Sequence, residues 1–190
     1  MPRNKEDARK RLMKAALELF AENGFDRTTA AQIAARAGVT ERTFFRHFPD
    51  KREVLFDGQT ILGAALSKVI VEAQPHLSPI DTLRLAFASI ADMIEQNRQI
   101  SEPRRHIISA TPALQEREVA KHAAMTQVVA AALRKRGIEP RRADLAAQAG
   151  LAVLSHALDA WFADPSSRLA DHFDCAFAEL QALALTADRR

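Results

Sequence analysis

The most distinctive chemistry in the sequence lies in the stretch 40–48, where aromatic, polar and charged side chains are combined within about two helical turns. Phe44 and Phe48 stand four positions apart, a spacing that puts two side chains on one face of a helix. Five further positions carry polar or charged groups, namely Glu41, Arg42, Thr43, Arg46 and His47. A helix anchored by an apolar face can present such groups to base edges and phosphates, which indicates nucleic-acid binding. An ordinary pair of packed helices would show the same pattern, so that alternative stays open.

Start and stop residues predict the elements that position this helix. Thr29 and Gln32 form a capping box that opens a short helix, and Gly38 ends it. Thr40 then caps the helix described above. Two short helices joined by a tight turn that contains glycine are typical of a helix-turn-helix.

The rest of the chain also predicts helices. It has 37 alanines among 190 residues, and the β-branched and aromatic runs typical of strands are missing. Asp50 and Glu53 form a second capping box at the start of a long helix. Further helix starts and stops predict helices at about 4–23, 51–73, 79–98, 100–109, 112–136, 140–163 and 168–185. The sequence thus predicts an all-α fold of about nine helices, with a helix-turn-helix domain at 1–50, a helical bundle at 51–190 and the helix at 51–73 connecting the two.

Composition excludes several classes of protein. The chain is 47% hydrophobic and 27% charged, as in ordinary globular proteins. Its single cysteine, Cys175, excludes an internal disulfide and a four-cysteine zinc module. We expect no apolar run that approaches the roughly 18 residues of a membrane span, and the N-terminus lacks the apolar stretch of a signal peptide. We therefore expect a cytoplasmic protein with no membrane partner.

Positive charge is concentrated in the first quarter of the chain. Residues 1–52 hold 12 Lys and Arg against 7 Asp and Glu, whereas the remainder holds 15 against 17. This imbalance favours an anionic partner for the N-terminal part. Cations at the start of the chain could add phosphate contacts or form a solvated arm, and they are Arg3, Lys5, Arg9, Lys10 and Arg11.

Residues 8–56 resemble the DNA-binding domain of the TetR family of transcriptional regulators. The positions that match the family pattern are Gly24, Phe25, Thr28, Thr29, Ile33, Ala34, Ala37, Gly38, Val39, Thr40, Thr43, Phe44, Phe45, His47, Phe48 and Lys51. The resemblance implies a dimeric repressor that leaves a palindromic operator when a small apolar or amphipathic ligand binds. We expect no enzymatic activity and no cofactor.

The resemblance also assigns roles to individual residues. The expected DNA-binding residues are Thr28, Thr29, Thr40, Glu41, Arg42, Thr43, Phe45, Arg46, His47 and Lys51. Thr28 and Thr29 would bind phosphate at the start of the second helix, as a helix N-terminus favours anions. His47 and Lys51 would contact the DNA backbone. Phe45 departs from the family, which more often has tyrosine there, and it cannot donate a hydrogen bond to a phosphate.

Residues at the start of the third helix would face the major groove. Arg42 could bind guanine, Glu41 could accept a hydrogen bond from cytosine N4, and the Thr43 methyl group could contact a thymine methyl group.

The C-terminal part is expected to form a dimer interface and a ligand pocket. In the family, the last two long helices of each subunit form the interface, and the candidates here are Ala149, Gly150, Val153, Ala157, Phe173 and Phe177. A mostly apolar pocket is expected between the preceding helices. Its candidate residues are Phe87, Ile90, Ile94, His122, Met125, Val129 and Trp161. The alternative for both sets is core packing within one subunit.

Catalytic and metal sites have little support in the sequence. The spacings His172-x-x-Cys175 and Glu118-x-x-x-His122 supply only two ligands each, so no metal site is expected. Cys175 lies beside Phe173 and Phe177, which predicts a buried thiol. A second hypothesis for the function is a helical interaction or ligand-binding protein that no longer binds DNA.

Overall fold

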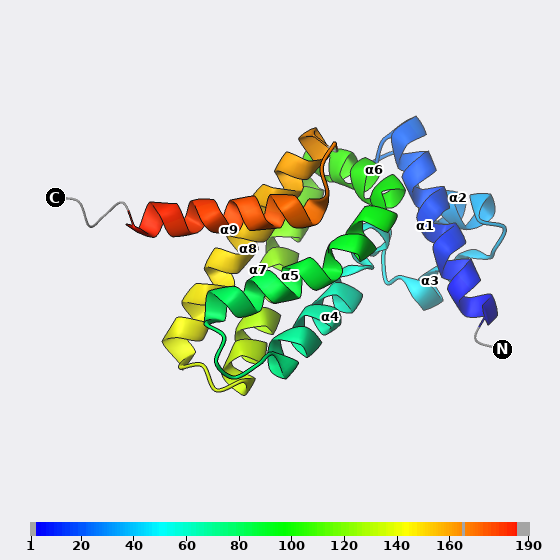
Figure 1. Ribbon diagram of the computed structural model, residues 1–190. Helices are drawn as coiled ribbons and strands as arrows, with labels where there is room; N and C mark the ends of the chain where they lie inside the picture. Colours follow the sequence, from blue (N-terminus) through cyan, green and yellow to red (C-terminus); the bar gives the residue numbers. More distant parts are fainter. Residues whose placement is uncertain (1–2, 165, 186–190) are drawn as a thin grey trace. The chain divides into compact units, whose positions relative to one another are not determined.

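The computed structural model describes residues 3–164 and 166–185, which form nine α-helices and one short 3-10 helix but no strand (Figure 1). The all-α prediction is therefore confirmed. The helices are α1 (Arg3–Asn23), α2 (Ala30–Arg36), α3 (Glu41–His47), the 3-10 helix η1 (Glu53–Phe56), α4 (Gln59–Glu72), α5 (Pro79–Gln96), α6 (Arg98–Ser109), α7 (Pro112–Lys135), α8 (Pro140–Ala163) and α9 (Leu169–Leu185).

The two short helices begin where the sequence predicts. The Thr29 hydroxyl accepts the backbone N–H of Gln32, and the Gln32 side chain accepts the N–H of Thr29 at 2.8 Å. The Thr40 hydroxyl accepts the N–H of Thr43 at 3.2 Å. Between the helices, Gly38 has a φ of +67°, a conformation that L side chains rarely adopt. These caps and this turn fix the first residue of both helices.

The prediction of one helix over 51–73 is wrong in its first part. Asp50 does accept the N–H groups of Arg52 and Glu53, but the turn that follows is the four-residue η1, and α4 begins only at Gln59. Three consecutive apolar side chains in η1, from Val54 to Phe56, are all buried. One face of a regular helix buries every third or fourth residue, so this run favours an irregular turn.

The stretch Glu53–Glu72 is apolar on average. It is long and apolar enough to cross a bilayer by length and composition alone, as the core helices of soluble proteins also can be. One third of it is buried inside the protein.

The chain divides into two compact units. The first unit consists of the described residues up to Gly58 together with Asn97–Ala120, and the second consists of Gln59–Gln96 together with the described residues from Lys121 onward. The division into a helix-turn-helix domain at 1–50 and a helical bundle at 51–190 stays a prediction. The buried apolar residues of the first unit come mainly from α1, α2, α3 and η1, and Ile107, Ile108 and Leu114 complete the same cluster.

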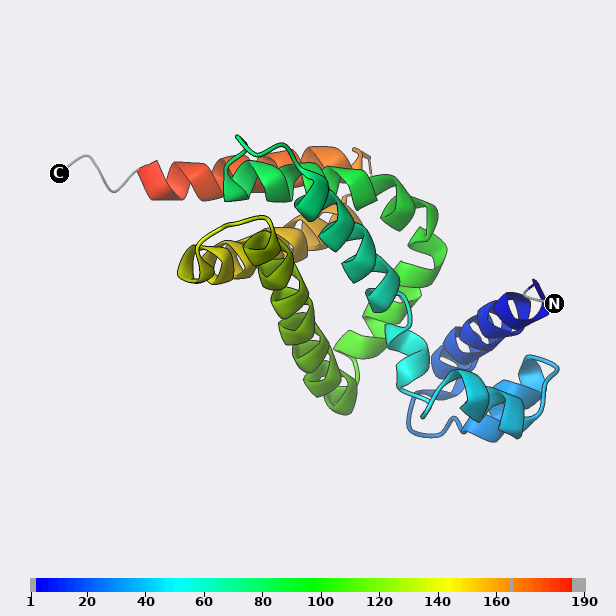
Figure 2. The same ribbon diagram turned by 90° about the horizontal axis from the view of Figure 1, so that it is seen from below.

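The second unit is built around α5, which packs against both α8 and α9 (Figures 1 and 2). The Phe87 ring lies with its centroid 5.7 Å from those of both Phe173 and Phe177. An ideal Cβ built on Gly150 would lie 2.7 Å from Leu83 Cδ1, closer than real Cβ atoms approach a neighbour. Glycine at this position therefore allows the close packing of α8 on α5.

This packing corrects the predicted dimer residues. Gly150, Val153, Ala157, Phe173 and Phe177 are buried inside the second unit and cannot offer a surface to another subunit. The stripe of small and aromatic residues serves the core of one chain, which is the alternative that the sequence left open. Only Ala149 of the predicted set is partly exposed.

We expect Gly150→Ala to destabilise the protein by about 1 kcal/mol, because overpacking costs about 1–3 kcal/mol and alanine returns about 1 kcal/mol of helix propensity. The matched change Gly63→Ala in α4 should be neutral or stabilising, since the atoms nearest to a Cβ there belong to Met125 and Val128 and lie at ordinary distances of 3.5–3.6 Å. Urea unfolding measures both, and a Gly150→Ala protein as stable as Gly63→Ala would contradict the close approach.

Candidate nucleic-acid interface

Helix α3 presents a polar face that is held in place by a buried apolar one. Phe44 and Phe48 are fully buried in the core of the first unit, with ring centroids 5.7 Å apart. Arg42 and Arg46 are exposed and stand one helical turn apart on the other side, flanked by exposed Glu41. The arrangement supplies two cations and one carboxylate on a surface that no other described part of the first unit covers.

Phe45 is an apolar group on this polar surface. Half of its side chain is exposed (50%), and its ring stands nearly perpendicular to that of Phe44 at a centroid distance of 5.4 Å. The edge-to-face contact fixes the orientation of the exposed ring. Phe45 can therefore make apolar contacts, such as with a thymine methyl group, but no hydrogen bond.

The other predicted residues of α3 have partly internal roles. The Thr40 and Thr43 hydroxyls are hydrogen-bonded to each other at 3.0 Å, in addition to the cap at the start of the helix. His47 is half-buried, with its ring 6.4 Å from that of Phe48. These side chains border the exposed face rather than form its centre.

The two threonines before α2 have different environments. Thr29 is exposed at the helix N-terminus, where phosphate binding stays a prediction. Thr28 is only 1% exposed. Its hydroxyl donates to two carbonyl oxygens, that of Gly24 at 2.9 Å and that of Leu19 at 3.2 Å. The prediction that Thr28 binds phosphate is thus corrected, because its hydroxyl is buried and bonds the backbone.

Lys51 also faces the protein. Its Nζ atom lies 2.8 Å from the carbonyl oxygen of Phe25, 2.9 Å from that of Thr28 and 3.4 Å from that of Asp26. The same atom lies 4.2 Å from the centroid of the Phe25 ring. These hydrogen bonds favour a role of Lys51 inside the protein over the expected contact with the DNA backbone.

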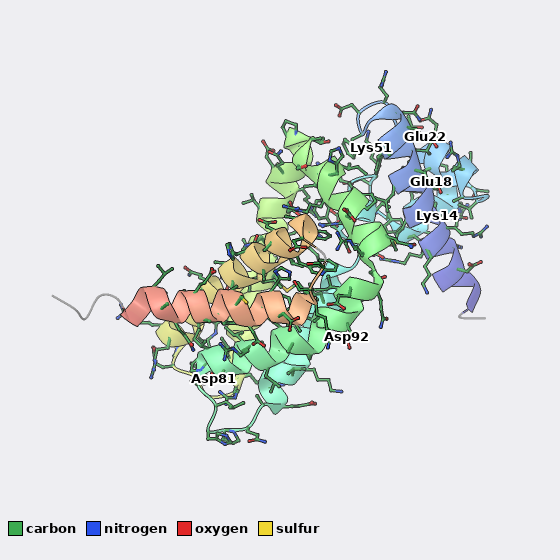
Figure 3. The ribbon with its side chains drawn as sticks, turned by 45° about the horizontal axis from the view of Figure 1, so that its top comes forward. Lys14, Glu18, Glu22, Lys51, Asp81 and Asp92 are labelled. Carbon is green, nitrogen blue, oxygen red and sulfur yellow. The ribbon has the colours of Figure 1, made fainter. Side chains whose placement is uncertain are left out.

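An ion-pair cluster braces α1 against the end of α2. Arg36 donates to the Glu22 carboxylate at 2.8 and 3.0 Å and to Glu18 at 3.4 Å. Figure 3 shows Glu18 and Glu22 on the same side of α1. The hydrogen bonds from Arg36 lower the pKa of Glu22 below its ordinary value, and they raise that of Arg36. Sequence reasoning missed this pairing, because partners 14 residues apart on different helices leave no local pattern.

The cations near the N-terminus are partly engaged. Arg9 forms a bidentate pair with Asp57, which raises the pKa of Arg9, and its guanidinium lies 4.8 Å from the Phe48 ring centroid. Arg11 lies 3.7 Å from Asp7. The Arg3 and Lys5 side chains lie outside the described residues. Arg9 thus fixes α1 to the turn after η1 instead of extending as an arm.

A half-buried cation, Arg104, joins α6 to this unit and was also missed from the sequence. Arg104 donates to the Leu55 carbonyl oxygen, lies 5.2 Å from the Phe56 ring centroid and reaches Glu118 at 3.3 Å. Burial lowers the pKa of Arg104, and Glu118 opposes that shift. The neighbouring Arg117 pairs with Glu53 at 2.6 Å, so η1 is held by two arginines.

The expected pocket residues mostly lie in one core. Phe87, Ile90, Met125, Val129 and Trp161 are buried in the apolar cluster of the second unit, and Ile94 packs against it half-buried. His122 is exposed, so it does not belong to that cluster and the expectation for it is corrected.

The side chains considered for other chemistry are scattered. Cys175 is exposed, so the expectation of a buried thiol is wrong. No group of three or more His, Cys, Asp or Glu gathers for a metal ion among the residues that the structure describes.

The chain is similar to known regulators over both of its parts. Residues 12–57 match the family model described as bacterial regulatory proteins, tetR family, and residues 77–184 match that of the MftR C-terminal domain. The chain is 26% identical over 165 residues to MftR of Mycobacterium tuberculosis, described as a mycofactocin biosynthesis transcriptional regulator, which covers 85% of this chain and 83% of that protein. It is 34% identical over 82 residues to the HTH-type transcriptional regulator TcmR of Streptomyces glaucescens, which covers 43% of this chain and only 36% of TcmR.

A solved structure shares the fold. FadR of Thermus thermophilus, described as a TetR-family transcriptional repressor in complex with lauroyl-CoA, superposes with a TM-score of 0.57 at 26% identity. The match covers 91% of this chain and 93% of FadR.

We expect Thr28→Val to lower the free energy of unfolding by about 1 kcal/mol, because it keeps the shape of the side chain and removes a buried hydrogen-bond donor. Thr60→Val, at an exposed position of α4, should stay within about 0.5 kcal/mol of the parent protein. Urea denaturation followed by circular dichroism measures both. Equal midpoints for the two variants would show that the Thr28 hydroxyl contributes nothing to stability.

Proposed function

The chain belongs to the TetR family of bacterial regulatory proteins, and on that premise we propose that it is a dimeric repressor released from a palindromic operator by a small apolar or amphipathic molecule. Its general role is that of a DNA-binding, ligand-responsive transcriptional regulator. The observation that carries the proposal is the exposed face of α3, which Phe44 and Phe48 hold against the core. We expect this regulator to act in the cytoplasm.

The proposed DNA contacts divide into base and phosphate contacts. Arg42 would bind guanine and Glu41 cytosine N4, while the exposed Phe45 ring and the Thr43 methyl group would contact thymine. Arg46, Thr29 and His47 would contact phosphate, which sets register but carries no sequence information. A dimer that makes on the order of 8 phosphate contacts would lose several powers of ten in affinity between low and physiological salt.

The outer faces of α8 and α9 are the proposed seam of the dimer. On this side His156 Nε2 lies 3.5 Å from Glu179 Oε2, which joins the exposed faces of the two helices. Leu145 is 69% exposed and Leu183 is 74% exposed. The small exposed residues of these helices that would let two copies approach closely are Ala152, Ala178 and Ala182. A two-fold pair suits a two-fold operator with half-sites about one helical turn, or a multiple of it, apart.

The effector would bind in the apolar interior of the second unit. FadR was crystallised with lauroyl-CoA, whose long acyl chain is apolar, and this favours a ligand with an apolar part here as well. The proposed lining residues are those of the expected set that remain after His122 is removed, namely Phe87, Ile90, Ile94, Met125, Val129 and Trp161. Such a ligand releases the operator only if it binds the non-DNA-binding state more tightly.

Binding of the full chain to duplex DNA tests the proposal. We expect selection from a random duplex pool, and the gene's own upstream region, to yield a palindrome bound in a salt-sensitive manner. Arg42→Ala should relax base preference at one position per half-site by about tenfold. Arg46→Ala should weaken all sequences alike and lower the magnitude of the salt slope by about 0.9 for each phosphate that Arg46 neutralises.

The control is Lys68→Ala, which removes an exposed cation of the second unit and should leave binding unchanged. If the parent protein ignores duplex DNA even in dilute buffer, the alternative of a helical interaction protein that no longer binds DNA is favoured instead.

We expect Leu145→Glu to turn the dimer into a monomer, because a charge would be buried on the proposed seam. Sedimentation equilibrium of the full chain measures the change. The matched control is Leu85→Glu, which alters an exposed leucine of α5 and should leave the dimer intact. A parent protein that sediments as a monomer, or a Leu145→Glu protein that stays dimeric, would contradict this seam.

A further inference from the structure

We propose that Lys51 is a positioning residue for DNA binding, whose ammonium group holds the loop before α2 in its binding conformation and contacts no phosphate. This inference rests on the proposed function and concerns the segment 24–29. The loop leads from the end of α1 directly into Thr29, the cap of α2.

The hydrogen-bonding capacity of Lys51 is used inside the protein. An ammonium group has three N–H donors and no acceptor. The three carbonyl oxygens of Phe25, Asp26 and Thr28 all lie within 3.4 Å of Nζ. The Phe25 ring lies 4.2 Å from the same atom and adds a cation–π contact. A phosphate oxygen would have to displace one of these carbonyls to bind Lys51.

The loop is held from two sides. Lys51 binds its carbonyl groups, while the Thr28 hydroxyl donates to the backbone at Leu19 and Gly24 from the buried side. Gly24 itself has a φ of +82°, which lets the chain reverse directly after α1. The Thr28 N–H also donates to the Phe25 carbonyl oxygen at 3.3 Å. Few conformations of residues 24–29 satisfy all of these bonds together.

This ordering matters because α2 is short and begins at the loop. A loop that is ordered before DNA arrives does not lose that conformational entropy on binding. Removing the ammonium group should therefore weaken DNA binding without removing a phosphate contact. The two roles, direct contact and positioning, differ in what they do to the free protein and to the salt dependence.

The test compares three charge-removing variants of the full chain. Lys51→Met keeps the apolar stem and deletes the ammonium group. Arg46→Met deletes an exposed cation of α3. Arg136→Met deletes a cation that likewise donates to two backbone carbonyls, those of Gln74 and Leu77, but in the second unit. Hydrogen exchange of the free proteins and DNA affinity over a range of salt concentrations are measured for all three.

We expect Lys51→Met to speed amide exchange in residues 25–30 by at least about tenfold and to lower DNA affinity by about tenfold, with a salt slope close to that of the parent protein. Arg46→Met should lower the slope by about 0.9 and leave exchange in the loop unchanged. Arg136→Met should change neither the loop nor DNA binding. Two results for Lys51→Met would overturn the proposal. One is unchanged amide exchange in the loop together with a reduced salt slope, and the other is faster amide exchange together with the DNA affinity of the parent protein.

A further measurement uses the parent protein alone, so it gives a result even if the Lys51→Met variant misfolds. Lysine acylation by a small succinimidyl ester, followed by mass spectrometry, should modify Lys51 at least about tenfold more slowly than exposed Lys14, since a donor bound to carbonyls is protected. Equal acylation rates for the two lysines would show that the carbonyl oxygens do not hold the Lys51 ammonium group, and would overturn the proposal. Exchange and acylation are read in the absence of DNA, so they stay decisive even if the chain proves not to bind a duplex.

Discussion

A seven-residue helix such as α3 is too short to be stable alone in water, so its existence depends on the burial of one face. Phe44 and Phe48 provide that burial, and the Thr40 cap fixes where the helix begins. The positions of the exposed Arg42 and Arg46 are set by these two buried rings, because all four residues lie on the same short helix or at its C-terminal end. Every chemical property proposed for the surface therefore depends on two aromatic side chains that would never touch DNA.

Local rules predicted much of this unit because its caps and turns are written in neighbouring residues. The Thr29 capping box and the Gly38 turn are examples, since hydrogen bonds across three residues need only the local sequence. Thr28 and Lys51 could not be assigned in this way. Their partners lie up to 26 residues away, and a hydroxyl or an ammonium group suits a backbone carbonyl as well as a phosphate.

The helices of the second unit illustrate a different limit. Periodicity showed which residues of α8 share a face, but it could not tell whether the neighbour would come from the same chain. Gly150 fits either answer in the sequence, and only the approach of Leu83 decides that its neighbour is α5. The opposite face, with Leu145, was available from the same pattern, because the exposed side of a helix follows once its buried side is known.

The place of α6 in the first unit has a consequence for building chimeras between relatives. Ile107, Ile108 and Leu114 finish the apolar core that α1, α3 and η1 begin, and Arg104 secures η1. Cutting the polypeptide once after Gly58 would leave that interior open to water. An exchange of the second unit between relatives would instead have to transplant two separate pieces of chain, with junctions near residues 58, 96 and 120. The segment Asn97–Ala120 would have to stay with the first unit, to which it belongs.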